Sequence, residues 1–220
     1  MGLGIDNRHR IAKRAAQEIE NGMIVNLGIG IPSLIPNYVP SAIAVMFHAE
    51  NGIVGIGPSP LEGQEDENAC NAAGYPITTL SGSSYCDSAI AFGMIRKGYV
   101  DMTILGALEV SEQGDLANWI VPGKRVPGMG GAMELAQKVK KVVVLMNHTN
   151  KNGEPKLVKT CSLPLTAKRC VDLIITDRAV LKIEKNHLLL IEVMSPYTVE
   201  DVLQATDATV ELSDSIKIIP

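Results

Sequence analysis

Short, uninterrupted runs of Val, Ile and Leu constrain the fold of this chain more than any other feature. Strands buried on both faces show such runs, whereas strands with one solvated face alternate apolar and polar residues. The clearest runs lie at 23–27, 42–48, 100–105, 142–146, 172–176 and 188–193. Each is far shorter than the roughly 20 apolar residues that span a bilayer. The runs therefore predict a mainly parallel sheet and no membrane-spanning segment.

Helical patterns separate these strands, and we expect helices at 10–20, 88–97, 132–139 and 198–205. In the first of them Ile11, Ala15 and Ile19 share one face, and Asn21-Gly22 ends it because these residue types accept a left-handed backbone. No linker, repeat or low-complexity tract divides the chain. The alternation predicts one α/β domain over residues 1–220, an open, mainly parallel sheet with flanking helices.

Composition excludes several classes of function. The 220 residues carry a net charge of −4, the wrong sign for gripping a phosphate backbone, and one Trp, five Tyr and two Phe leave little material for stacking bases. The first residues contain no apolar signal-peptide core. The four cysteines, Cys70, Cys86, Cys161 and Cys170, form no CxxC pair. We therefore expect free thiols, a cytoplasmic location and no nucleic-acid partner.

Chemistry is expected in the loops that follow the strands, because open α/β sheets bind ligands beyond the carboxyl ends of their strands. Gly28 and Gly30 follow the first strand, but the third glycine of the dinucleotide fingerprint is missing. This turn is either a connector or a ligand contact. Three glycines within 128–131 precede a helix, where free backbone N–H groups suit an anion or a developing oxyanion.

Glu50 stands directly after an apolar strand and before Asn51-Gly52. It is either a turn residue or a carboxylate nucleophile, and a nucleophile needs an oxyanion hole nearby. Candidate donors for such a hole are Asn26 and the backbone amides of Gly130, Gly131 and Ala132. The four histidines, His9, His48, His148 and His187, show no metal-binding spacing and are interpreted as surface or core residues. The acidic run at 62–67 is interpreted as a solvated loop.

A family resemblance joins these separate motifs. Residues 47–55, Phe-His-Ala-Glu-Asn-Gly-Ile-Val-Gly, resemble the Ser-Glu-Asn-Gly signature in the B (beta) subunits of family I coenzyme A transferases. Matching segments at 26–32, 111–119, 128–133 and 160–166 follow in family order, and the resemblance runs from about Arg10 to Asp207. The nearest groups are the 3-oxoacid (succinyl-CoA:acetoacetate) and the acetate/butyrate–acetoacetate CoA-transferases. The resemblance implies a fold shared by CoA-transferases and sugar-phosphate isomerases.

The resemblance also implies a ping-pong reaction through a glutamyl-CoA thioester, with Glu50 as nucleophile and Asn26 as oxyanion donor. It places contacts to CoA or substrate at Gly28, Gly30, Asn51, Gly130, Gly131 and Ala132. Coenzyme A would be a substrate and covalent intermediate, and no permanently bound cofactor or metal is implied. The implied partners are acyl-CoA, a carboxylic acid and an A (alpha) subunit, in an αβ or α2β2 assembly.

Two positions depart from the family pattern. Ala49 stands where the family has Ser, and Asn71-Ala72-Ala73-Gly74 stands where relatives often read Asn-Ala-Gly-Lys. The sequence therefore does not name the acyl donor. Two other functions remain open at this point: an isomerase that uses Glu50 as a base, and a non-catalytic binding subunit of the same fold.

Overall fold

The computed structural model describes residues 3–123 and 128–220. Their backbone forms two compact units, each described here by itself. Unit 1 contains the described residues up to 106 together with 138–141, and unit 2 contains the rest. Among the described residues, no helix combines the length and the apolar character required to cross a membrane.

Unit 1 contains the strands that carry Asn26 and Glu50. Its elements are α1 (Leu3–Ala15), η1 (Ala16–Glu18), β1 (Ile24–Leu27), η2 (Ile31–Asn37), β2 (Met46–Ala49), β3 (Ile53–Ile56), β4 (Thr79–Tyr85), α2 (Ser88–Arg96) and β5 (Met102–Gly106). The strand order is β5-β1-β2-β3-β4. β1 pairs in parallel with β2 and β5, while β3 is antiparallel to β2 and β4. The carboxyl ends of β1, β2 and β5 therefore lie at one edge of the sheet.

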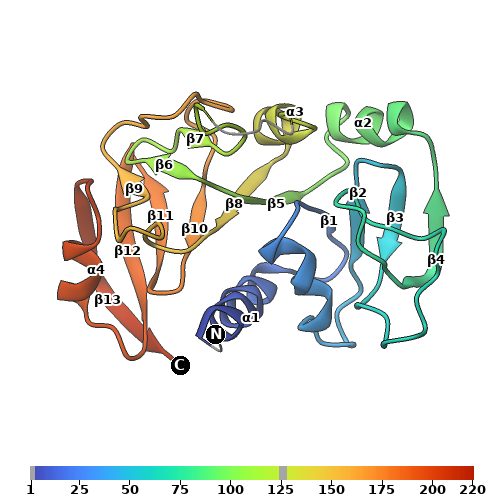
Figure 1. Ribbon diagram of the computed structural model, residues 1–220, viewed down its shortest axis with the longest axis horizontal. Helices are drawn as coiled ribbons and strands as arrows, with labels where there is room; N and C mark the ends of the chain where they lie inside the picture. The colour runs from blue at the N-terminus through green and yellow to red at the C-terminus, as the bar shows by residue number, and fades with distance from the viewer. Residues whose placement is uncertain (1–2, 124–127) are drawn as a thin grey trace. The chain divides into compact units, whose positions relative to one another are not determined.

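Helices cover both faces of these strands. Figure 1 shows α1 and η2 on one side and α2 on the other. Each layer contains a fully buried apolar side chain, namely Ile11 of α1, Val25 of β1, Ile35 of η2 and Ile95 of α2. Because β1 is covered on both faces, its side chains are apolar on both faces except at Asn26. A polar residue in such a strand requires partners, which are described below.

Unit 2 is built around a second set of strands. Its elements are β6 (Glu109–Ser111), β7 (Leu116–Ala117), α3 (Ala132–Lys138), β8 (Lys141–Leu145), β9 (Leu157–Val158), β10 (Leu173–Ile175), β11 (Ala179–Glu184), β12 (His187–Met194), α4 (Val199–Gln204) and β13 (Val210–Ile219). The last residue of α3 and the first of β8 belong to the segment 138–141. The order is β8-β10-β11-β12-β13, and a separate small sheet has the order β7-β6-β9. β10 is parallel to β8, and β11 is antiparallel to both its neighbours.

The predicted open α/β architecture is confirmed, as are most predicted elements. The predicted strand at 42–48 is wrong in its first half, because β2 begins at Met46. The first helix also differs: it starts at Leu3 and tightens into η1 after Ala15. The strands β3, β4, β11 and β13 and the small sheet were not predicted. β4 reads Thr-Leu-Ser-Gly-Ser-Ser-Tyr and is mostly exposed, so that only its pairing with β3 makes it a strand.

Candidate active site

Glu50 follows the last residue of β2 and begins the turn into β3. This turn depends on Gly52, whose φ of +112° belongs to the region that side chains disfavour. A Cβ at Gly52 would lie 1.9 Å from the carbonyl oxygen of Cys86. The Cys86 amide also donates to the Gly52 carbonyl at 2.8 Å. The turn therefore holds the half-buried Glu50 at the carboxyl edge of the parallel strands.

Asn26 is the polar residue buried inside β1, and it lies beside Glu50. Its Nδ2 atom is 3.2 Å from Oε2 of Glu50. Its Oδ1 atom accepts a hydrogen bond of 2.9 Å from the hydroxyl of Thr103, which is fully buried in β5. Because an ionised carboxylate only accepts hydrogen bonds, the amide nitrogen must be the atom that faces Glu50. The structure therefore brings together the two residues for which the sequence predicted catalytic roles.

His48 completes this cluster, and sequence reasoning missed it as a site residue. It is fully buried in β2, and its Nδ1 atom lies 3.2 Å from Nδ2 of Asn26. Burial lowers the pKa of His48 below its ordinary value, while the Glu50 carboxylate and the backbone of Ala91 act in the opposite direction. A signal was present in the sequence: residues two apart in a strand share a face, which puts His48 on the side of Glu50.

The glycines after β1 shape a tight connection. The Gly28 amide donates to the Ile104 carbonyl at 2.8 Å, and a Cβ at Gly28 would approach that oxygen to 3.0 Å. Gly30 has a φ of +92° and leads into η2, and its carbonyl accepts from the Ser33 hydroxyl at 2.8 Å. Both glycines thus have structural reasons to be present. Their contact with CoA or substrate stays a prediction.

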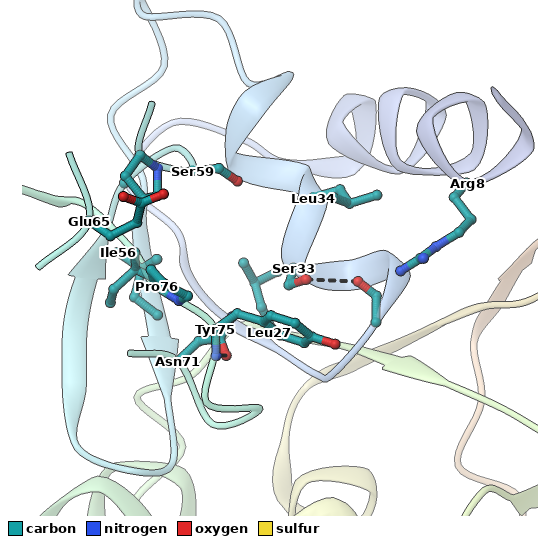
Figure 2. Close-up of a pocket in the computed structure, with 14 residues that line it drawn as sticks. Arg8, Leu27, Ser33, Leu34, Ile56, Ser59, Glu65, Asn71, Tyr75 and Pro76 are labelled. Atoms are coloured by element: carbon teal, nitrogen blue, oxygen red, sulfur yellow. Dashed lines mark hydrogen bonds between the residues drawn. The ribbon is translucent and has the colours of Figure 1, made fainter. Parts of the chain in front are cut away.

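A cavity of about 350 Å³ opens beside this connection in unit 1. Gly30 lines it, as does Leu27, the residue after Asn26. Figure 2 shows Arg8 of α1, Leu34 of η2 and Tyr75 of the loop before β4 around the same space. The walls combine apolar side chains with a few polar groups, which is the usual character of a small-molecule pocket.

Asn51 uses its side chain to hold the loop that carries Cys70. Its Nδ2 atom donates to the Cys70 carbonyl at 2.9 Å, and its side chain is exposed. The next residue, Asn71, lines the cavity described above. Asn51 therefore connects the Glu50 turn to one wall of the cavity, and its predicted contact with CoA remains a prediction.

The glycine-rich segment before α3 belongs to unit 2. Gly128 and Gly130 have φ values of +101° and +55°. The Gly131 carbonyl accepts from the Leu135 amide at 3.0 Å, and the Ala132 amide makes a longer bond of 3.4 Å to the Met129 carbonyl. The predicted role of Gly130, Gly131 and Ala132 in the oxyanion hole stays a prediction.

The remaining sequence interpretations concern the cysteines, the acidic run and metal binding. All four cysteines are free thiols. Residues 62–67 are exposed, as expected for a solvated loop. Within residues 3–123 and 128–220, no group of three or more His, Cys, Asp or Glu side chains is arranged to hold a metal ion.

Comparison with known proteins places this chain in a family. The model of the coenzyme A transferase family matches residues 8–205. The chain belongs to the coenzyme A transferase family. It is 60% identical over 212 residues to the probable beta subunit of a coenzyme A transferase from Bacillus subtilis, covering 96% of this chain and 98% of that protein. It is 52% identical over 209 residues to the probable B subunit of a succinyl-CoA:3-ketoacid coenzyme A transferase from the same organism, covering 95% and 97%.

Solved structures agree on the fold. The apoenzyme of the acyl-CoA transferase YdiF from Escherichia coli O157:H7 superposes with a TM-score of 0.78 at 22% sequence identity. The match covers 97% of this chain, which spans only 43% of that longer chain. The predicted family and fold class are confirmed, and the predicted CoA-transferase class is confirmed at the level of the family.

Proposed function

We propose that this chain is the catalytic B subunit of a CoA-transferase that moves CoA between an acyl-CoA and a short-chain carboxylic or 3-oxo acid. The observation that carries the proposal is the Asn26 amide, held by Thr103 and placed 3.2 Å from the Glu50 carboxylate. A nucleophilic carboxylate with an oriented N–H donor beside it is the pair that acyl transfer requires. The printed names of the two B. subtilis relatives support the same class of reaction.

The reaction proceeds as two half-reactions, and Glu50 is a free carboxylate again at the end of the second. A Glu50 carboxylate oxygen attacks the thioester carbonyl, and CoA thiolate leaves to form an acyl-glutamyl anhydride. The thiolate then attacks the glutamyl carbonyl and releases the first acid, which leaves a glutamyl-CoA thioester. The second acid repeats these steps in reverse order and departs as a new acyl-CoA. Each tetrahedral intermediate places negative charge on an oxygen near Glu50, where a donor such as Asn26 lowers the barrier.

The proposal has further parts that rest on the sequence. The whole chain, residues 1–220, acts as one CoA-transferase domain, with an A subunit as partner in an αβ or α2β2 assembly. The two B. subtilis relatives are named as the beta and the B subunits of their enzymes, which supports such a partner. Gly28, Gly30, Asn51 and the 130–132 segment contact CoA or substrate. The four free thiols support a cytoplasmic location.

Intact-mass measurement tests the covalent mechanism. The chain, co-expressed with its A subunit, is incubated with an acyl-CoA and no acceptor acid. We expect CoA bound covalently to Glu50, on the peptide that contains residues 48–51, and loss of this adduct when an acid is added. Borohydride is expected to reduce the thioester and inactivate only the acyl-CoA-treated enzyme.

Two variants sharpen the test. Glu50→Ala should abolish both adduct and exchange. Glu50→Asp keeps the charge but shortens the side chain by one methylene, and we expect a loss of about 10²-fold. An isomerase that uses Glu50 as a base, or a non-catalytic subunit, would form no adduct. An unchanged mass under conditions in which the assembled enzyme turns over would therefore refute the proposal.

A further inference from the structure

The amide nitrogen of Asn26 has more acceptors around it than it has protons. Glu50 Oε2 lies at 3.2 Å, His48 Nδ1 at 3.2 Å and the His48 carbonyl oxygen at 3.3 Å. An amide group carries two N–H bonds, and Thr103 already occupies the Oδ1 side. The direction of the N–H bonds therefore depends on which of these neighbours accepts them. One of the acceptors, the ring nitrogen of His48, gains or loses acceptor capacity with its protonation state.

The contact between Asn26 and His48 determines the tautomer of the ring. Because the amide nitrogen only donates, Nδ1 of His48 must present its lone pair, so that the neutral ring carries its proton on Nε2. A protonated ring would direct an N–H at the Asn26 NH₂ group. The contact therefore exists only while His48 is neutral.

The surroundings of His48 keep its ring in this state. The side chain is fully buried, and within the described residues Nε2 is a buried atom with no hydrogen-bond partner. Glu50 is the charged group that acts on the ring. Three uncharged groups also lie beside His48, namely Asn26 of β1, Val54 opposite in β3 and the backbone of Ala91 in α2.

We propose that His48 is a positioning residue that, as a neutral imidazole, accepts one N–H of Asn26 at Nδ1 and so directs the other N–H at Glu50. Protonation of His48 turns the Asn26 amide away from the position of the oxyanion. The inference rests on the proposed function, because it assigns His48 an effect on the acyl transfer at Glu50. It adds a pH dependence that comes from the His48 ring.

Two substitutions separate positioning from packing. His48→Asn places a carbonyl oxygen near the position of Nδ1, which preserves an acceptor and removes the titration. His48→Leu fills similar space without an acceptor. The rate constant for formation of the glutamyl-CoA adduct is measured by rapid quench and intact mass, with the A subunit present, from pH 8 down to the lowest pH at which the protein stays folded. Circular dichroism and thermal melting confirm that each variant is folded.

We expect His48→Leu to lower the rate constant about 10²-fold at pH 7.5, the order observed for loss of an oxyanion donor, with little change in the acyl-CoA concentration at half-saturation. His48→Asn should recover most of that loss. As the pH is lowered, the wild-type rate should fall when His48 is protonated, whereas His48→Asn should lack this part of the pH dependence.

The outcomes distinguish this inference from the proposed function. Equal rates in folded wild type and His48→Leu would overturn the positioning role, and so would a folded His48→Asn as slow as His48→Leu. The side-chain ¹⁵N signal of Asn26 gives an independent readout, because it should shift with pH in wild type and stay constant in His48→Asn. If wild type forms no adduct while the ¹⁵N signal of Asn26 still shifts with pH, the covalent mechanism fails and the contact between His48 and Asn26 stands. A pH-independent Asn26 signal in wild type overturns the inference.

Discussion

Three polar side chains, Asn26, His48 and Thr103, lie fully buried on neighbouring strands of unit 1. Burying polar groups among apolar side chains is costly unless they bond to one another. Thr103 and Asn26 meet this requirement with a bond of 2.9 Å. Among the described residues, Nε2 of His48 makes no hydrogen bond of normal length, although the backbone of Ala91 acts on this ring. Burial of these polar side chains destabilises the fold, and the same side chains surround the Asn26 amide that faces Glu50.

At this scale we predict the effect of Asn26→Ala. The variant should fold and bind acyl-CoA nearly as wild type does, but kcat should fall about 10²- to 10³-fold, because the donor is needed most where charge develops. Steady-state kinetics of the assembled enzyme, with calorimetric titration of acyl-CoA, separates kcat from binding. A variant that lost only thermal stability would show that Asn26 is a structural strand residue.

At the scale of elements, the loop between β3 and β4 differs from the family pattern. Gly74 has a φ of +77°, is exposed, and has no atom within 4 Å of the position of a Cβ. The family resemblance of the sequence implies Lys at this position in relatives. The next residue, Tyr75, lines the cavity in unit 1. The loop therefore has room for a longer side chain at residue 74. The positive φ of this residue, however, disfavours any side chain there.

We predict that Gly74→Lys lowers KM for a donor whose acyl group carries a free carboxylate, such as succinyl-CoA, about 5-fold relative to Gly74→Ala, the equivalent of about 1 kcal/mol for an exposed ion pair. Gly74→Ala is the matched control, because both variants carry the same backbone strain of about 1–2 kcal/mol. Initial rates with succinyl-CoA and with butyryl-CoA measure the effect. Equal KM changes for both donors would show that the charge at this position does not select the substrate.

The segments of unit 2 that follow β8 and β10 meet at a buried histidine. Nδ1 of His148 lies 2.9 Å from the hydroxyl of Thr176, and Nε2 lies 2.9 Å from that of Thr206. Burial lowers the pKa of His148 to about 4; Asp177 opposes this shift, while the charges of Arg178 and Lys156 add to it. Between pH 6.5 and about 4, the ring is therefore neutral in the folded protein but protonated in the unfolded chain.

This histidine makes stability depend on pH. Between pH 6.5 and about 4 the unfolded chain binds a proton at His148 that the folded chain does not, so stability falls as the pH is lowered through this range. We expect a loss of about 2 kcal/mol between pH 7 and pH 5 from this residue, at about 1.4 kcal/mol per pKa unit. Urea unfolding at both pH values checks this, with His148→Gln as the control. An equal loss in both proteins would contradict the assignment.

At the scale of the whole molecule, the two relatives from Bacillus subtilis are named as the beta and the B subunits of their enzymes. We predict that the chain co-purifies with a co-expressed A subunit as an αβ or α2β2 complex, since obligate interfaces typically bury more than about 2,000 Å². Size-exclusion chromatography with light scattering measures the assembly. Full transferase turnover by the isolated chain would contradict this prediction.

The class of the fold and the candidate nucleophile could both be predicted from local sequence. Apolar runs such as 142–146 are local signals, because burial on both faces requires apolar residues at every position. Glu50 was recognisable for the same reason, since a carboxylate directly after such a run must lie at the end of a strand. The family motifs then indicated a role for Asn26.

Which polar groups meet could be learned only from the three-dimensional arrangement of the strands. Asn26 contacts His48 and Thr103, which are 22 and 77 residues away along the chain, because β1 pairs in a specific register with both β2 and β5. That register is set by hydrogen-bond ladders and packing between distant segments, which leave no local pattern in the sequence. The same reason explains β4 and β13, which are mostly exposed and become strands through the neighbours they pair with.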